Sequence, residues 1–316
     1  MPRDFFQKAA PGLTGPSGSV IASIQRTLNA LTTSPITVDG IYGGQTVSAI
    51  SDFQKNKGLT VSGSVSDVTW TALMKTPAPP IFDRCLQLTA SFEGTGFTQV
   101  VGNFDGAGIT WGIIGFTLMG GELGQILTEI NVAHPDLLAK AFGEDSDEVL
   151  VKTGPKTADA DKLAWADSIS RGANNYRVAD PWKTYFHDLG TYLPVQQMQI
   201  DRARTKYWSI AQKNLSSLSM GDELDCALLF DVAVQNGGMG SKNRLTSALD
   251  QFTQQKPKTA LDRRKIVAQV VADTVSGKFK QDVLDRKTSI AVGDGTIHGG
   301  SYKLADWGLL DGILPT

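Results

Sequence analysis

A proline-rich run, Lys75-Thr-Pro-Ala-Pro-Pro80, divides the chain into two segments of very different size. Its prolines favour an extended, semi-rigid spacer. We therefore predict a small domain over residues 1–74 with its core at 20–74, a linker at 75–80 and a larger domain at 81–316. The first segment, with about 60 ordered residues, is too short for a large hydrophobic core, whereas the second can bury one.

The small segment carries the patterns of three short helices. Apolar residues recur at helical spacing in two stretches, which are Ile21, Ile24, Leu28 and Leu31, then Val47, Ile50 and Phe53. Gly58 supplies a stop for the second helix, and Asp67 is expected to cap a third one. The pair Asp39-Gly40 marks the turn between the first two helices.

The same segment contains a specific series of motif residues. In order they are Ile24-Gln25, Leu28-Asn29, Leu31, Val38-Asp-Gly-Ile-Tyr-Gly43, Thr46, Ala49-Ile50, Phe53-Gln54, Gly58-Leu59, Gly63, Thr69-Trp70 and Leu73. With this series, Val20–Met74 resembles the three-helix peptidoglycan-binding domain of many cell-wall hydrolases. The resemblance implies that bacterial peptidoglycan is the partner. We expect the turn residues Asp39, Gly40, Ile41 and Tyr42 to lie at the surface and bind the wall.

The large segment opens with a predicted helix that ends next to a carboxyl group. Ile81, Cys85, Leu88 and Phe92 form a buried stripe, and Glu93 follows it directly. A carboxyl group beside apolar residues loses solvation, which raises its pKa and suits a general acid. A solvated glutamate at a helix end remains the alternative.

A hairpin is predicted next, because two apolar and aromatic runs, 97–104 and 109–116, flank Asp105-Gly-Ala-Gly108. Asp105 alone is also typical of a plain turn. A helix ending in Glu and a hairpin carrying Asp would place two carboxyl groups across a groove, as glycoside hydrolysis requires. Thr110, on the returning strand, has a hydroxyl that could hold a water molecule beside Asp105.

Two runs in this region are specific. Leu88-Thr-Ala-Ser-Phe-Glu93 and the stretch from Asp105-Gly-Ala-Gly-Ile-Thr110 to Leu123 resemble the catalytic core of glycoside hydrolase family 46, the chitosanases. The resemblance implies a mainly α, two-lobed, lysozyme-like α+β domain with a small β-hairpin or sheet. It implies that Glu93 is the general acid, that Asp105 is the general base and that Thr110 positions the attacking water. The reaction would invert the anomeric carbon without a metal or organic cofactor.

Asp231 lies inside an apolar helix predicted over residues 223–235. A carboxylate in such surroundings needs a partner, because burying an unpaired charge is costly. The family resemblance implies a network in which an Asp and two arginines orient the catalytic acid. The matching arginines here are Arg286 and Arg264, with Arg263 remaining an alternative to Arg264.

Composition excludes several other classes. A net charge of −2 argues against a nucleic-acid partner, and the absence of a run of about 18 apolar residues argues against a membrane span or stable membrane association. His134, His187 and His298 lie far apart, and nothing pairs them with Cys85, so a cysteine peptidase, an amidase or an endopeptidase is disfavoured.

The N-terminus lacks the apolar core of a secretory signal. We expect synthesis in a host cytoplasm, action on the wall after membrane permeabilisation, and a monomer.

A wall-binding module joined to a glycosidase resembles a modular bacteriophage endolysin. Tethering an enzyme to its polymer raises the local concentration of cleavable bonds. We therefore predict a muramidase that hydrolyses β-1,4 bonds of the glycan strand. A lytic transglycosylase, a chitosanase and a non-catalytic wall-binding protein are the alternatives, and the presence of Asp105 and Thr110 favours hydrolysis.

Overall fold

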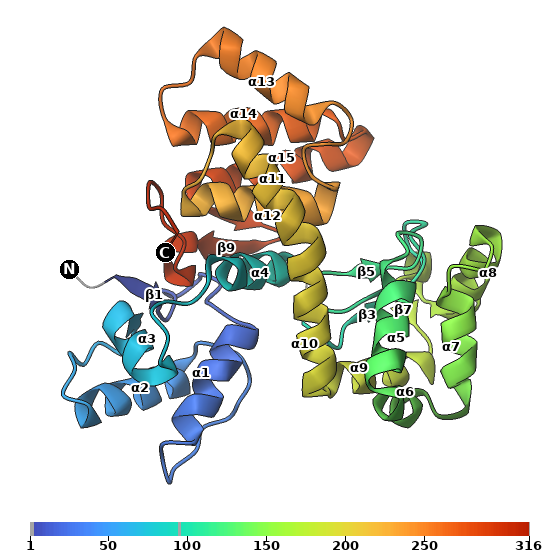
Figure 1. The fold of residues 1–316 in the computed structure, drawn as a ribbon, viewed down its shortest axis with the longest axis horizontal. Helices are drawn as coiled ribbons and strands as arrows, with labels where there is room; N and C mark the ends of the chain where they lie inside the picture. Colours follow the sequence, from blue (N-terminus) through green and yellow to red (C-terminus); the bar gives the residue numbers. More distant parts are fainter. Residues whose placement is uncertain (1–2, 94–95, 316) are drawn as a thin grey trace. The chain divides into compact units, whose positions relative to one another are not determined.

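The computed structural model describes residues 3–93 and 96–315 of this mainly helical protein (Figure 1). The strands of the described residues are only two to four residues long and pair in small antiparallel sheets. The predicted fold class, mainly α with small sheets, is confirmed. Two compact units make up the chain: unit 1 comprises Met1–Phe92 and Lys206–Thr316, and unit 2 comprises Glu93–Thr205.

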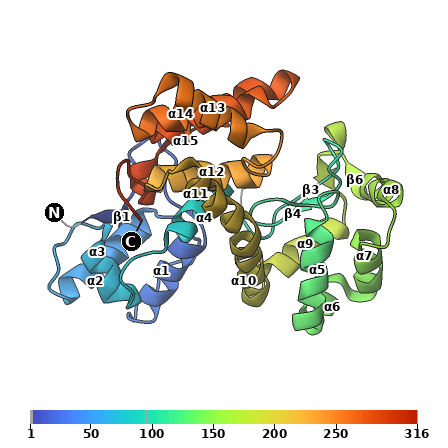
Figure 2. The ribbon, with the colours of Figure 1, turned by 45° about the horizontal axis from the view of Figure 1, so that its top comes forward.

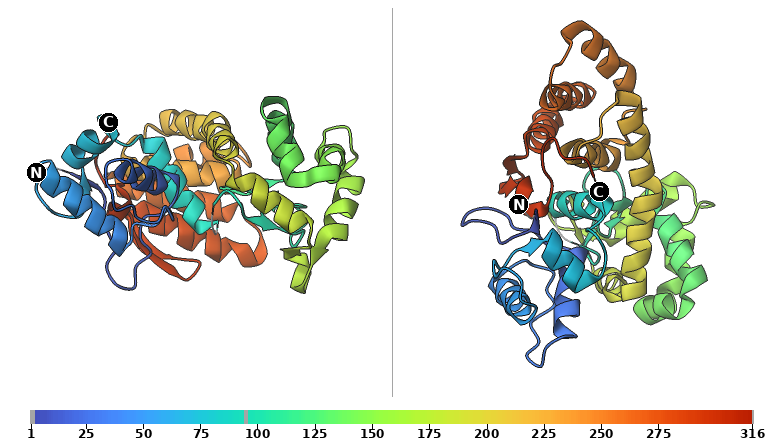
Figure 3. Two further views of the ribbon diagram at one scale, coloured as in Figure 1. Left: turned by 90° about the horizontal axis from the view of Figure 1, so that it is seen from below. Right: turned by 60° about the vertical axis from the view of Figure 1, so that its left-hand side comes forward.

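The three helices predicted near the N-terminus are present in unit 1. They are α1 (Ser19–Asn29), α2 (Gly44–Asn56) and α3 (Asp67–Met74), drawn in blue to cyan in Figure 3. A short strand pair that the sequence pattern did not predict, β1 (Asp4–Phe6) with β2 (Val65–Ser66), completes this module. We call β1, β2 and α1 to α3 the N-terminal module. Its core buries the helical stripes together with Phe5, Phe6 and Val65.

Two details of the module differ from the prediction. Ser66, rather than Asp67, is the N-cap of α3, because its side chain accepts the backbone N–H of Thr69. Helix α1 ends at Asn29, so Leu31 lies outside it and is 60% exposed instead of continuing the buried stripe. Gly58 follows the end of α2 with a φ of 66°, as expected for a helix stop.

The segment from Lys75 to Pro80 is not a free spacer. Thr76 accepts the indole N–H of Trp70 at 2.9 Å, Ala78 packs on the core of the N-terminal module, and the Pro79 carbonyl accepts from Arg84 Nε at 3.2 Å. The predicted extended linker is therefore wrong for this segment, since tertiary contacts outweigh the local stiffness of its prolines.

The rest of unit 1 is a helical cluster around α12 (Figure 2). Helix α12 packs against α4, α11, α14 and α15, and its residues from Glu223 to Ala233 are buried. Asp222 caps its first turn, and Gly237 follows its last residue in the left-handed conformation, as predicted. The elements are α4 (Ile81–Phe92), η3 (Ala203–Trp208), which crosses the unit boundary, α11 (Ser209–Leu218), α12 (Glu223–Asn236), α13 (Arg244–Gln255), α14 (Ala260–Asp273), η4 (Gly277–Phe279), α15 (Lys280–Val292), β8 (Asp294–Ile297), β9 (Gly300–Lys303) and η5 (Leu304–Trp307).

In its described residues, unit 2 combines a three-stranded sheet, β3-β4-β5, with six α-helices, two short 3-10 helices and a second small strand pair, β6-β7. Buried aromatic rings of Trp111, Phe142, Trp182 and Phe186 pack edge to face or tilted in its interior. The elements are β3 (Val100–Val101), β4 (Thr110–Trp111), β5 (Phe116–Thr117), α5 (Glu122–Ala133), α6 (Pro135–Phe142), η1 (Gly143–Asp145), α7 (Ser146–Thr153), α8 (Asp159–Ile169), β6 (Ser170–Arg171), η2 (Ala173–Asn175), β7 (Arg177–Val178), α9 (Trp182–Thr191) and α10 (Leu193–Arg202). Across all described residues, no helix is long and apolar enough to cross a membrane.

Candidate active site

Helix α4 is buried along almost its whole length and ends at Phe92, immediately before Glu93. The Phe92 ring packs edge-on against Tyr302 of β9, with centroids 5.0 Å apart, and the Arg286 guanidinium of α15 lies 5.0 Å from the ring centroid. The Phe92 carbonyl accepts from Nδ1 of His298 at 3.1 Å. We call Arg286, His298 and Tyr302 the Phe92 clamp. It fixes the residue that precedes the predicted general acid.

His298 holds its place in the clamp at a conformational cost. It occupies the turn between β8 and β9 with a φ of 49°, a left-handed conformation that side-chain-bearing residues seldom adopt. Its Nε2 lies 3.3 Å from a carboxylate oxygen of Asp282 on α15. Both ring nitrogens are thus engaged, which fixes the orientation of the ring toward the end of α4.

Asp231 has the buried partners that its surroundings require. Arg286 Nη2 donates to its carboxylate at 2.6 Å, and Lys287 Nζ donates to the other oxygen. Burial alone would raise the pKa of Asp231, but the two cations more than offset this and lower it to about 2. The structure thus contains an Asp231–Arg286 pair, and the role of this pair in orienting the catalytic acid stays a prediction. Lys287 was missed, although its position next to Arg286 in the sequence was a visible signal.

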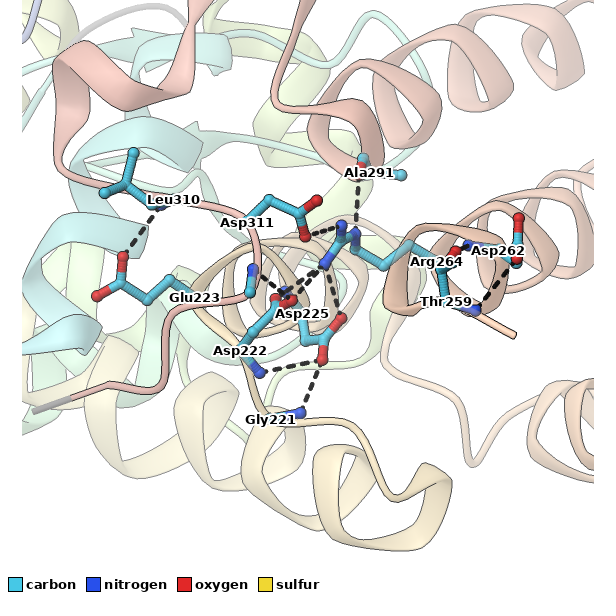
Figure 4. A network of polar contacts seen from close by, with 11 residues as sticks. Gly221, Asp222, Glu223, Asp225, Thr259, Asp262, Arg264, Ala291, Leu310 and Asp311 are labelled. Carbon is cyan, nitrogen blue, oxygen red and sulfur yellow. Dashed lines mark hydrogen bonds and ion pairs between the residues drawn. The ribbon is translucent and has the colours of Figure 1, made fainter. Parts of the chain in front are cut away.

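Arg264 does not join this network, so its predicted pairing with Asp231 is wrong. It donates to Asp222 at 2.7 Å, to Asp225 at 3.2 Å and to Asp311 at 2.5 Å (Figure 4). These contacts tie the start of α12 to α14 and to the C-terminal segment. The alternative, Arg263, donates to the Ser219 carbonyl instead. The cluster is a structural tie, since Asp222 is also the cap of α12.

The predicted hairpin exists, but its strands are short. Val101 of β3 pairs with Thr110 of β4, which leaves residues 102–109 as a long loop, and β5 adds a third strand. Asp105 lies exposed in that loop, where its Oδ1 accepts the backbone N–H of Ala107 at 3.0 Å. Thr110 is partly buried on β4. The prediction that Glu93, Asp105 and Thr110 act together remains a prediction.

The predicted wall-binding turn is only partly at the surface. Tyr42 is buried and donates its hydroxyl to the Gly63 carbonyl at 3.0 Å, and Gly40 is buried as well, so the expectation of surface positions is wrong for both. The Asp39 carboxylate is exposed but accepts from Gln25 at 2.8 Å. Burial would raise the pKa of Asp39, but the hydrogen bond from Gln25 and the backbone hydrogen bonds outweigh it, so the pKa is lowered. Ile41 is 54% exposed.

A groove of about 690 Å³ opens elsewhere on the N-terminal module, between α1 and α2. Exposed polar residues such as Ser48 and Gln45 share its lining with apolar ones, and Asp52 and Lys57 bring opposite charges to it. A mixed lining of this kind can bind a ligand that has both polar and apolar parts.

Neither a reactive thiol nor a metal-binding cluster is found among the described residues. Cys85 and Cys226 are buried free thiols on α4 and α12. Burial raises the pKa of both, to about 12 for Cys226, so neither forms a reactive thiolate near neutral pH. No group of three or more His, Cys, Asp or Glu side chains in the described residues could hold a metal ion.

Comparison with known proteins places the N-terminal module in a recognised group. Residues 17–73 match the family described as "Putative peptidoglycan binding domain". No curated protein matches the chain. Two solved structures are similar over 71% of the chain. One is a GH46 chitosanase from Gynuella sunshinyii in complex with chitotetraose, with 13% sequence identity, 98% of that chain covered and a TM-score of 0.49. The other is a mutant chitosanase from Bacillus subtilis MY002 complexed with 6 GlcN, with 15% sequence identity, 96% of that chain covered and a TM-score of 0.47. A family similarity is thus established for residues 17–73, as a similarity to peptidoglycan-binding domains.

Proposed function

We propose that this protein is a glycoside hydrolase of the bacterial cell wall, attached to peptidoglycan by its N-terminal module. The observation that carries the proposal is the match of residues 17–73 to a peptidoglycan-binding family. It is supported by the motif residues in 88–123, which resemble a glycosidase catalytic core in the same chain. Attachment to the polymer would raise the effective concentration of its glycosidic bonds.

In the proposed reaction, Glu93 donates a proton to the leaving glycosidic oxygen. Asp105 removes a proton from a water molecule held by Thr110, and that water attacks the anomeric carbon as the glycosidic bond breaks. A single displacement inverts the configuration at that carbon. The Phe92 clamp supports the role of Glu93, because a fixed end of α4 restricts the residue that follows it. The exposure of Asp105 supports its access to water.

The finer proposal is a muramidase of the bacteriophage endolysin type, monomeric and acting on the wall after the host membrane is permeabilised. A chitosanase is the second candidate, favoured by the resemblance of Leu88–Leu123 to that family. A lytic transglycosylase would use the same acid without the base, and a non-catalytic wall-binding protein would use neither.

The test compares purified peptidoglycan and chitosan as substrates for the wild type, Glu93→Gln and Asp105→Asn. Removing a general acid or base typically costs 10²–10⁴-fold, so each variant should lose about a thousandfold in rate. Glu148→Gln, which changes an exposed acid on α7, is the matched control and should keep full activity. Cleavage of chitosan alone would establish the second candidate, and undiminished clearing by Glu93→Gln would refute the proposed acid.

We also infer that the groove between α1 and α2 takes the wall fragment, because two of the four predicted turn residues are buried. Ser48→Trp places a large ring in the groove and should reduce cosedimentation with insoluble peptidoglycan. Ile41→Ala removes the exposed apolar turn residue and should leave cosedimentation unchanged. If Ile41→Ala reduces cosedimentation and Ser48→Trp does not, the turn at residues 39–42 binds the wall instead of the groove.

A further inference from the structure

Two exposed aromatic rings lie together in unit 2, outside the residues assigned so far. Phe104 and Tyr176 are 47% and 52% exposed, and their ring centroids are 5.3 Å apart with planes tilted by 57°. Phe104 immediately precedes Asp105, the proposed base. We propose that these rings form a sugar-binding platform for the glycan strand, with Arg177 recognising a carboxylate that the sugar unit carries. The inference rests on the proposed function and specifies its substrate.

The backbone around the platform is firmly held. The Gly102 N–H donates to the Tyr176 carbonyl at 2.9 Å, which joins the two loops that carry the rings. A side chain at Gly102 would meet the Asn175 carbonyl at 2.2 Å, so only glycine allows this close approach. Asn103 adds a backbone N–H bond to Ser170 Oγ at 2.9 Å and a side-chain bond to Asp167 at 2.7 Å. A site fixed in this way loses little entropy when a ligand binds.

The loop before Tyr176 stores conformational strain. Asn174 and Asn175 have φ values of 53° and 57°, two consecutive residues in the left-handed region. Strained backbone of this kind persists where the surroundings enforce it, and it is concentrated at ligand-binding segments. Tyr176 follows directly, and its ring is 52% exposed.

The chemistry of the surroundings fits a sugar ring. The platform borders a pocket of about 360 Å³, and its lining combines the two rings with Ala173, Asn174 and Arg177. The apolar C–H face of a pyranose can lie on an aromatic face, while the amide and guanidinium groups supply hydrogen bonds at its edge. A few polar groups beside apolar rings are the usual composition of a small-molecule site.

The positive charge of Arg177 distinguishes glycans that carry carboxylates from glycans that carry ammonium groups. Arg177 is exposed and forms no ion pair with another described residue. A guanidinium binds a carboxylate through two parallel hydrogen bonds. The muramic acid units of peptidoglycan carry carboxylates on their lactyl groups or attached peptides, whereas chitosan carries ammonium groups that Arg177 would repel. The geometry therefore favours an N-acetylmuramic acid unit of peptidoglycan as the occupant.

The experiment measures KM and kcat on soluble peptidoglycan glycan fragments and on chitosan oligomers of equal length. Phe104→Ala and Tyr176→Ala should each raise KM for the peptidoglycan fragments roughly tenfold while kcat stays within about twofold. Phe279→Ala, at a 55% exposed ring on η4 of unit 1, is the matched control and should change neither constant.

The charge is tested by Arg177→Glu and Arg177→Lys. Charge reversal should lower kcat/KM for the peptidoglycan fragments about tenfold or more relative to chitosan oligomers, and the lysine variant should retain part of the wild-type preference. Unchanged KM in both alanine variants of an active enzyme, or an unchanged preference in Arg177→Glu, would overturn the inference. Absence of any glycan cleavage by the wild type would instead refute the proposed function on which it rests.

Discussion

At the scale of single residues, Asp231 shows how a charge can be kept in the interior. Its carboxylate is fully buried on α12, and Arg286 and Lys287 approach it from α15. A buried ion pair adds little net stability, yet removing one partner leaves an uncompensated charge at a cost of about 3–5 kcal/mol. The pairing therefore fixes how α12 and α15 fit together.

Asp231→Asn should reduce the free energy of unfolding at pH 7 by about 3–5 kcal/mol. The pKa of Asp231 is about 2 in the folded protein, below the value of roughly 3.9 for an unfolded aspartate, so its charge stabilises the fold above about pH 4. That contribution is lost as pH falls from about 4 to 2. Urea unfolding over this range should show the difference between wild type and variant shrinking. A constant difference would contradict the pairing.

Arg264 and Arg263 are neighbours in sequence with different surroundings. Arg264→Ala would leave Asp222 and Asp225 buried without their cation, and should cost about 3–5 kcal/mol. Arg263→Ala removes a surface hydrogen bond and should cost at most about 1 kcal/mol. Urea unfolding of the two variants measures both losses in free energy of unfolding. Equal losses would show that the Arg264 cluster in Figure 4 stabilises the fold no more than a surface hydrogen bond does.

At the scale of elements, the end of α4 depends on a hairpin far along the chain. The β8–β9 turn places His298 against the Phe92 carbonyl, and β9 places Tyr302 against the Phe92 ring. A donor at the last turn of a helix satisfies a carbonyl that has no partner within the helix. We infer that His298 is a positioning residue for Glu93.

His298→Ala should lower kcat on peptidoglycan about tenfold with little change in KM, because it loosens the end of α4 beside the proposed acid, Glu93, without touching the substrate. His298→Gln keeps a side-chain donor and should restore part of the rate. His187→Ala, at an exposed histidine of α9 that contacts its neighbour Asp188, is the control. A rise in KM with unchanged kcat would assign His298 to substrate binding instead.

The elements also show what a sequence can reveal. Helices α1 to α4 and α12 were predictable, because apolar periodicity and glycine stops are local signals. The pairing of β1 with β2 was not, since it joins residues about sixty positions apart. Local patterns likewise placed Tyr42 in a turn without revealing its burial. They indicated that Asp231 needs a cation, but tertiary packing decided that Lys287 rather than Arg264 stands beside Arg286.

At the scale of the whole molecule, the N-terminal module is fastened to the helical part of unit 1. Glu223 of α12 is buried between Arg3 and Arg84, with Arg84 Nη1 at 2.7 Å, and accepts the Leu310 N–H at 3.0 Å. Strand β1 also lies against η5. The module is therefore integrated into unit 1, where the proline-rich run had predicted a separate domain on a spacer.

Glu223→Ala should release this attachment, because it removes the carboxylate by which Arg3, the residue before β1, is tied to α12, and it also leaves the buried Arg84 of α4 without that carboxylate. In the wild type, native-state hydrogen exchange in rising denaturant should show α1 and α12 losing protection together. In the variant, α1 should lose protection at a lower denaturant concentration. Asp250→Ala, at an exposed acid on α13, should behave as the wild type. Separate openings in the wild type would contradict the integrated module.

The central claim is that this protein hydrolyses the glycan strand of peptidoglycan. Mass spectrometry of the soluble products released from purified peptidoglycan tests it most directly. The account predicts muropeptides that have gained one water molecule at a reducing sugar end, since Asp105 and Thr110 are proposed to deliver water. Products with anhydro-sugar ends, or peptide fragments with intact glycan strands, would contradict it.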